Sequence, residues 1–168
     1  FHLFAGTHAR WVLKFARLPG HDQPFLREEI ALDAVARLGP SVASHAPAHL
    51  GRITVAGHHG AVETVAAGRP LVTLLPGSGG DLLDAIAEWI VLMGERSATP
   101  AEALAPERLR LHTEVVPRWA PEGVPADLVE QIPEVPGVLQ HNDLGSWNIM
   151  ADEGRFAAVD WESRRLVG

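Results

Sequence analysis

His141–Met150 reads HNDLGSWNIM and is followed at residues 159–162 by VDWE, and these two stretches decide the fold. Asn148 stands five residues after Asp143, and Asp160 stands twelve residues after Asn148. This spacing has a chemical logic, because phosphoryl transfer to a hydroxyl needs a carboxylate near the nucleophile and two oxygen ligands for Mg²⁺. Asp143 would take the hydroxyl proton. Asn148 and Asp160 would supply the hard oxygen ligands that Mg²⁺ prefers.

Each motif taken alone has a simpler explanation. An Asp-x-x-x-x-Asn loop is also typical of turns in which both side chains cap nearby amides. His141 alone is typical of a core histidine bonded to a backbone carbonyl, and Asp160 of a cap after a strand. A metal-dependent hydrolase built on His141, Asp143 and Asp160 is a further alternative, and it predicts tight Zn²⁺ or Mn²⁺ binding without any nucleotide.

The N-terminal part is predicted to be rich in strands. Residues 1–5 and 10–16 are apolar and rich in β-forming side chains, and residues 24–38 carry apolar side chains at helical spacing with Asp22 as the N-cap. Two further short strands, 52–55 and 61–65, are expected to flank a hairpin tip at His58–Gly60.

The remainder is predicted to be mainly helical. Flexible composition around residues 68–80 marks a boundary between two parts of the chain. Helices are expected at Leu82–Met93, Ala101–Arg118 and Ala126–Gln131, and strands at Gly137–Gln140 and Phe156–Trp161. The chain is therefore expected to be an α+β protein.

Composition narrows the possible functions. The 168 residues carry a formal net charge of −7, which is unfavourable for nucleic-acid binding, and no long uncharged apolar stretch predicts a membrane span. The absence of cysteine excludes disulfides and thiolate metal sites and fits a cytoplasmic protein. The first residues lack the pattern of a secretory signal.

The two motifs together resemble the aminoglycoside phosphotransferase and choline kinase group of small-molecule kinases. The catalytic loop of that group reads His-Gly-Asp-Leu-x-x-x-Asn-Ile, and its metal-binding aspartate commonly stands in Ile-Asp-Trp-Glu. Asn142 replaces the usual glycine here, and asparagine tolerates left-handed backbone better than most residues. The matching positions in this chain are His141, Asp143, Leu144, Asn148, Ile149, Asp160, Trp161 and Glu162.

The resemblance implies a protein-kinase-like two-lobed fold, truncated at both ends. Residues 1–70 would form a partial β-rich nucleotide-binding lobe that lacks most of the glycine-loop strand, and residues 71–168 a mainly helical lobe with the catalytic loop. The implied activity is transfer of the γ-phosphoryl group of ATP to a hydroxyl of a small molecule, with Mg²⁺. The alternative is an inactive nucleotide-binding pseudo-kinase or an inert fragment of such a kinase.

The resemblance also implies roles for individual residues, with Asp143 as the catalytic carboxylate. Lys14, the only lysine, lies within an apolar strand, where a charge needs a partner. It would contact the nucleotide phosphates and be positioned by Glu28, with Glu29 as the alternative. The segment joining the lobes would bind adenine through the backbone of Thr64, Val65 and Ala66.

Overall fold

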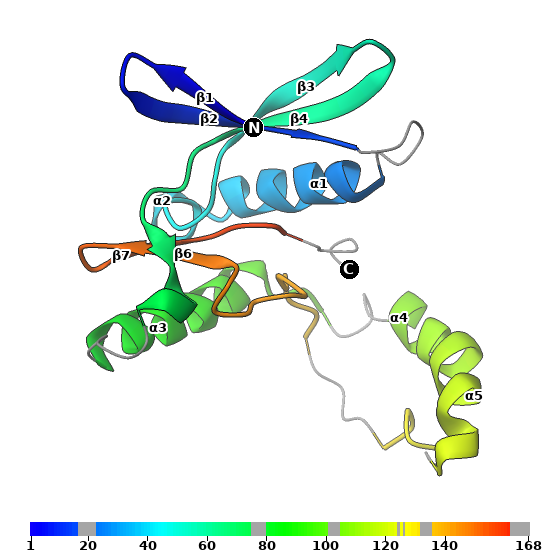
Figure 1. The fold of residues 1–168 in the computed structure, drawn as a ribbon. Helices are drawn as coiled ribbons and strands as arrows, with labels where there is room; N and C mark the ends of the chain where they lie inside the picture. The colour runs from blue at the N-terminus through cyan, green and yellow to red at the C-terminus, as the bar shows by residue number, and fades with distance from the viewer. Residues whose placement is uncertain are drawn as a thin grey trace.

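The protein is built from two antiparallel sheets and the helices that lie between and below them (Figure 1). The computed structural model describes residues 1–16, 23–74, 80–100, 105–123, 125, 127–131 and 136–161. The predicted α+β class is confirmed in this described part of the chain.

The N-terminal sheet has four strands in the order β1-β2-β4-β3. Every neighbouring pair is antiparallel, and Lys14 pairs with Ala61 while Val12 pairs with Glu63. Directly opposed residues in a sheet share a face, so Glu63 lies on the same face as Val12. Lys14 is two residues from Val12 along β2, so Lys14 and Glu63 point to the same side. The strands are β1 (His2–Ala5), β2 (His8–Phe15), β3 (His49–Val55) and β4 (His58–Thr64).

Helix α1 (Gln23–Arg37) connects β2 to the second half of this sheet and confirms the helix predicted over residues 24–38. Its apolar side is buried through Ala31, Leu32, Ala34 and Val35, whereas Ile30, which also belongs to the predicted apolar spacing, is exposed. Asp22, the predicted N-cap, lies outside the described residues.

The second sheet is small and has the order β5-β6-β7. It lies between α1 and the long helix α3 in Figure 1. The central strand directly follows the HNDLGSWN loop in the chain. It pairs with the segment near residue 70, where Arg69 is opposite Ala151. The elements are α2 (Pro40–Ala43), β5 (Arg69–Pro70), a 3₁₀ turn (Leu71–Thr73), α3 (Gly80–Ser97), β6 (Ile149–Asp152) and β7 (Arg155–Ala158).

One hydrophobic core joins α1, α2, α3 and the β6–β7 hairpin. Trp89 of α3 stands at its centre, with edge-on ring contacts to Phe156 at 5.6 Å and Trp161 at 6.2 Å between centroids. The indole N–H of Trp89 donates to the carbonyl of Val42 at 3.2 Å, so this buried polar group is paired. The core therefore places Trp161, the neighbour of Asp160, against helix α3.

The tip of the β3–β4 hairpin lies two residues earlier in the chain than predicted. His58 and His59 belong to β4, and the tip is Ala56-Gly57, with φ of 49° and 80°. Two consecutive left-handed residues make the tight turn whose twist matches a two-residue hairpin. The predicted tip at His58–Gly60 is wrong because Ala56, a residue that rarely adopts positive φ, gives no turn signal.

The predicted helix at residues 101–118 is interrupted where the structure describes it. It consists of α4 (Ala105–Arg110), a wider π-helical turn (Leu111–Val115) and α5 (Val116–Trp119), and a 3₁₀ turn (Ala120–Glu122) follows. Pro117 has no backbone N–H to continue a regular helical ladder, which explains the irregularity. Residues 101–104 lie outside the described residues.

Two other expectations for this half of the chain are wrong. Residues 127–131 form turns with i to i+3 hydrogen bonds rather than a helix, and Gly137 forms only a single bridge, to Thr99. The strand that pairs with β7 is β6, and β7 ends at Ala158 because the left-handed backbone of Asp160 turns the chain away. No strand is predicted from the sequence over residues 149–152, where β6 lies.

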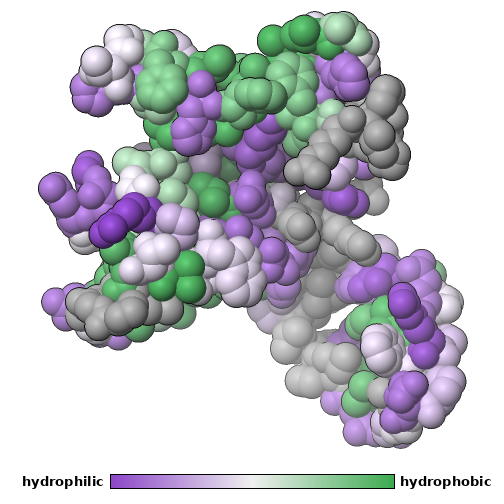
Figure 2. Space-filling view, viewed as in Figure 1, coloured by the Kyte–Doolittle hydropathy of each residue, from purple (hydrophilic) through white to green (hydrophobic). Residues whose placement is uncertain are grey.

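Apolar side chains also gather on the surface over the N-terminal sheet, as the green area at the top of Figure 2 shows. Exposed members of this surface are Phe1, Leu3, Phe4, Leu50 and Val55. Within the described ranges, none of the helices combines the length and the apolar composition that crossing a bilayer requires.

Gly68 offers a direct test of how closely the segment after β4 approaches β6. Its φ is +98°, and a Cβ at this position would overlap the backbone of Ala151. Gly57 has a φ of +80° with open space around it and serves as the matched control. We expect Gly57→Ala to cost about 1–2 kcal/mol for the left-handed backbone alone, and Gly68→Ala to cost clearly more. Urea unfolding of both variants measures this, and equal losses would contradict the close approach.

Candidate active site

Lys14 lies at the centre of a cluster of carboxylates that come from three separate elements. Its Nζ is 2.6 Å from Oε1 of Glu28 on α1, 3.2 Å from Oε2 of Glu63 on β4, and 2.9 Å from Oδ1 of Asp160 beyond β7. Lys14 and Asp160 are separated by 146 positions in the chain. The cluster therefore joins the N-terminal sheet, α1 and the end of the β6–β7 hairpin.

Burial differs strongly within the cluster. The side chains of Glu28 and Glu63 are 8% and 3% exposed, whereas that of Asp160 is 62% exposed. Asp160 is the carboxylate that solvent and a bound molecule can reach, and the two glutamates hold the ammonium group from the inside. The cluster has one ammonium group and three carboxyl groups, so positive charge is in short supply. This imbalance favours cationic or proton-donating partners.

The ionisation of the cluster follows from this imbalance. Burial alone would lower the pKa of Lys14, but the charges of Glu28, Glu63 and Asp160 raise it overall. Burial raises the pKa of Glu28 from 4.5 to about 7; Lys14 opposes this rise, and Glu63 and Asp160 add to it. Three carboxyl groups stabilise the charged form of Lys14, whereas the three carboxyl groups have only one ammonium group between them. We therefore infer a cationic Lys14 and a Glu28 that holds its proton more tightly than usual.

The structure decides which of two neighbouring glutamates meets Lys14. Glu28 makes that contact and also accepts a hydrogen bond from the backbone N–H of Trp161 at 3.3 Å. Glu29 points elsewhere and pairs with Arg52 of β3 at 2.5 Å. Adjacent helical residues are rotated by about 100°, so only one of them can face the cluster.

Glu63 falls within the strand predicted at residues 61–65, and no role is predicted for it. It stands alone as a charge in the apolar run from Ala61 to Val65, which is the same signal that singled out Lys14. Spacing could not reveal that the two residues meet, because their contact depends on the register of β2 against β4.

Asp143 and Asn148 hold each other within the HNDLGSWN loop. The Asn148 side-chain nitrogen donates to both the backbone oxygen and the Oδ2 of Asp143, each at 2.9 Å. Because the amide nitrogen is used in this way, the amide oxygen of Asn148 is the atom left to bind a cation. Asn142 has a φ of 69°, so the position where the resembling kinases carry glycine does adopt left-handed backbone.

Backbone hydrogen bonds place Asp160 beside this loop. The Val159 N–H donates to the Asn148 carbonyl at 2.9 Å, and the imidazole Nε2 of His141 bonds to the Val159 carbonyl at 2.9 Å. Asp160 follows with a φ of 58°, which turns its side chain out of the β7 line. Asn148 and Asp160 thus lie at the same end of the hairpin.

This donor set fits Mg²⁺ better than zinc. An amide oxygen and an exposed carboxylate are hard ligands, which leave most coordination positions to water or phosphate. In the described part of the chain, His, Asp and Glu side chains nowhere gather in a group of three or more suited to hold a metal alone. The imidazole Nε2 of His141 is already engaged with Val159, so that nitrogen does not support a hydrolase site on His141, Asp143 and Asp160.

A cavity of about 440 Å³ opens beside the Lys14 cluster. The apolar part of its lining comes from β2 through Val12 and from the β6–β7 hairpin and its end through Met150 and Val159. The segment after β4 closes one end through residues 64–68, and Lys14, Glu63 and Asp160 also line the cavity. A flat aromatic ring with a charged tail matches these walls.

Among the three residues predicted to bind adenine, one backbone N–H is left without a partner. The Thr64 and Val65 N–H groups donate to the carbonyls of Ala48 and Arg10 at 3.0 and 3.1 Å. The Ala66 N–H has no hydrogen-bond partner among the residues that the structure describes. Of the three residues predicted to bind adenine, Ala66 is therefore the one whose amide can donate to a ligand.

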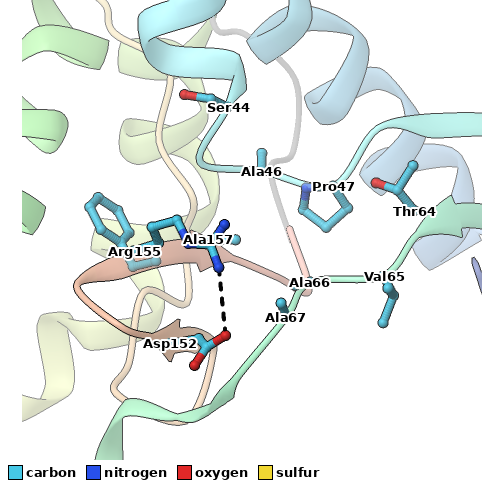
Figure 3. Close-up of a pocket in the computed structure, with 11 residues that line it drawn as sticks. Ser44, Ala46, Pro47, Thr64, Val65, Ala66, Ala67, Asp152, Arg155 and Ala157 are labelled. Atoms are coloured by element: carbon cyan, nitrogen blue, oxygen red, sulfur yellow. Dashed lines mark ion pairs between the residues drawn. The ribbon is translucent and has the colours of Figure 1, made fainter. Parts of the chain in front are cut away.

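The same segment also borders a second cavity of about 260 Å³ (Figure 3). Ser44 and the ion pair of Arg155 with Asp152 at 3.7 Å line this second cavity as well. Pro47 and residues 64–67 border both cavities, which therefore adjoin each other.

Most of the predicted site residues come together. Lys14, Glu28 and Asp160 are in direct contact, and Thr64, Val65 and Ala66 border the same cavity as Lys14. Asp143 and Asn148 do not line that cavity; they adjoin it through the backbone bond between Asn148 and Val159. Glu162, which completes the second motif, lies outside the described residues.

Comparison with known proteins identifies the family. The family model described as "Phosphotransferase enzyme family" matches residues 2–165, nearly the whole chain. This match confirms the resemblance to the aminoglycoside phosphotransferase and choline kinase group that the two motifs indicated. A search of the curated proteins finds no significant match.

Removing the ammonium group of Lys14 tests whether it neutralises the cluster. Lys14→Met leaves Glu28 and Glu63 buried without their counter-charge, so we expect a loss of stability on the order of 3 kcal/mol near pH 8. Arg52→Met, which breaks the exposed pair with Glu29, should cost only about 0–1 kcal/mol. Urea unfolding of the three proteins measures both losses.

The pH dependence of the Lys14→Met loss provides the control. The folded protein keeps the Glu28 proton up to about pH 7, whereas the unfolded chain releases it near 4.5, so ionising Glu28 costs stability as the pH rises through this window. Without Lys14 that cost grows, and the loss at pH 8 should exceed the loss at pH 5.5. A loss that is independent of pH would show that Lys14 stabilises by packing alone.

Proposed function

The chain belongs to the phosphotransferase enzyme family, and we propose that it transfers the γ-phosphoryl group of ATP to a hydroxyl group of a small molecule. The observation that carries this proposal is the 2.9 Å contact between Lys14 and Asp160, two residues from opposite ends of the chain, at the wall of one cavity. A lysine and a metal-binding aspartate at one site are what phosphate recognition by a kinase requires.

The 440 Å³ cavity supports a specific placement of the nucleotide. The base would lie between Val12 and Met150, with its ring edge at the Ala66 amide. Lys14 at the other end would contact the phosphates, since an ammonium held by buried carboxylates stays in place when a phosphate approaches. Glu28 would position Lys14 from α1.

Asn148 and Asp160 would hold Mg²⁺ at the phosphates. Both are oxygen donors at the end of the β6–β7 hairpin, and the exposure of Asp160 leaves its carboxylate free to turn from Lys14 toward a cation. Bound Mg²⁺ supplies charge neutralisation for the phosphate oxygens. The protein's part is to fix the two ligands in place.

Asp143 would act on the acceptor. The hydroxyl oxygen of the acceptor forms a bond to the γ-phosphorus, the bond from that phosphorus to the β–γ bridging oxygen breaks, and ADP leaves. The hydroxyl proton passes to the Asp143 carboxylate, which Asn148 orients through Oδ2. Catalysis by this arrangement consists of positioning and electrostatic stabilisation, with no covalent intermediate on the protein.

We also propose the two-lobed arrangement of protein kinases for this chain. Residues 1–70 would form the nucleotide-binding lobe and residues 71–168 the lobe with the catalytic loop. The cavity between the N-terminal sheet and the β6–β7 hairpin supports this division, because a nucleotide in it would contact both parts. The helix α1 bridges them, since its apolar side packs into the core with α3.

Replacement of Asp143 tests the proposed reaction. The Asp143 carboxylate is needed when the hydroxyl attacks and not when ATP binds, so Asp143→Ala should lower kcat by about 10²–10⁴-fold with little change in ATP affinity. Asn148 keeps its bond to the backbone oxygen of residue 143 in this variant. The assay measures ADP release across a panel of hydroxylated metabolites, and the ATP affinity is measured by calorimetry.

Ser146→Ala is the matched control, because Ser146 lies in the same loop and has no assigned chemical role. It should keep most of the activity. Normal turnover by Asp143→Ala would contradict the assignment of Asp143. ATP binding without ADP release by the wild-type protein across the whole panel would instead favour the nucleotide-binding pseudo-kinase.

A further inference from the structure

Glu63 carries a buried carboxylate oxygen that has no partner. Its side chain is 3% exposed, Oε2 is 3.2 Å from the Lys14 ammonium, and Oε1 accepts no hydrogen bond from any described residue. A buried acceptor without a donor costs free energy, and a charged one costs more. The fold nevertheless places this carboxylate at the wall of the 440 Å³ cavity.

The position of Glu63 in the sheet determines what it faces. It pairs with Val12 across β2 and β4, and Val12 lines the same cavity. Glu63 directly precedes Thr64. It therefore lies between the Lys14 ammonium on one side and the segment with the Ala66 amide on the other. A ring that fills the cavity beside Val12 therefore presents an edge toward Glu63.

We infer that Glu63 selects the nucleobase by accepting a hydrogen bond from an amino group on the ring, as adenine carries. This inference rests on the proposed function, since it assigns a specificity-determining role within the same nucleotide site. The Glu63 carboxylate would repel a ring whose corresponding atom is a carbonyl oxygen, because two acceptors would then face each other.

The ion pair with Lys14 narrows the choice of base. A carboxylate can recognise guanine through two parallel hydrogen bonds, one to each oxygen, and the Lys14 ammonium at 3.2 Å competes for Oε2 of Glu63. A single acceptor matches a single amino group. The Ala66 N–H supplies the complementary donor for a ring nitrogen.

Three nucleotides that differ at the edge of the ring test the inference. ATP carries the amino group, and purine riboside 5′-triphosphate carries hydrogen in its place with no other change. Inosine 5′-triphosphate carries a carbonyl oxygen there and, in addition, a proton on the neighbouring ring nitrogen. Their dissociation constants are measured by calorimetry with Mg²⁺ for the wild-type protein, Glu63→Gln and Glu29→Gln. Glu29 is the matched control, because it is a carboxylate on α1 that lies outside this cavity.

The wild-type protein and Glu29→Gln should bind ATP about tenfold or more tightly than purine riboside 5′-triphosphate, because one hydrogen bond to a charged group contributes an affinity difference of this size. The inosine nucleotide should bind most weakly. Glu63→Gln should lose part of the preference over the inosine nucleotide, because an amide can donate to the carbonyl, whereas the ring N–H of inosine still faces the Ala66 N–H. A purely structural role would weaken all three nucleotides alike and leave their ratios unchanged.

Two different failures are distinguishable. Equal affinities of the wild-type protein for ATP and the riboside would overturn the role of Glu63 while leaving the proposed function intact, and so would ratios that Glu63→Gln leaves unchanged. Absence of binding by all three nucleotides to the wild-type protein would overturn both. The wild-type measurement is decisive even when Glu63→Gln does not fold.

Discussion

The interaction on which the rest of the structure depends is the contact of one ammonium group with three carboxylates. Lys14 brings together α1, the end of β4 and the turn after β7. Two of the carboxylates are buried and the third is exposed. The buried pair fixes the lysine, and the exposed Asp160 is available for exchange with a ligand.

Contacts of the two residues that flank Asp160 fix its place in the structure. Trp161 follows Asp160 and lies in the core against Trp89, and its backbone N–H donates to Glu28. Val159 precedes Asp160 and is bonded to Asn148 and His141. Asp160 is thus held on both sides by buried residues while its own side chain stays exposed, which is the combination that a ligand-binding carboxylate needs.

Much of this was predictable from the sequence, for physical reasons. The motifs around Asp143 and Asp160 combine residue types with a spacing that phosphoryl transfer requires, and a lysine within an apolar strand signals a partner. Glu63 was missed because its contact with Lys14 depends on strand register, which spacing along the chain does not contain. The tip of the β3–β4 hairpin was misplaced because Ala56 adopts a backbone conformation that its side chain does not favour.

The central claim is that Asp160 exchanges Lys14 for a metal-bound nucleotide while Glu28 and Glu63 keep the lysine in place. Calorimetric titration of ATP with and without Mg²⁺, for the wild-type protein and Asp160→Asn, tests it most directly. Asparagine tolerates the left-handed backbone at this position, so the loop is retained. We expect Mg²⁺ to tighten ATP binding by the wild-type protein and to have little effect on the variant. The same Mg²⁺ dependence in both proteins would contradict the account.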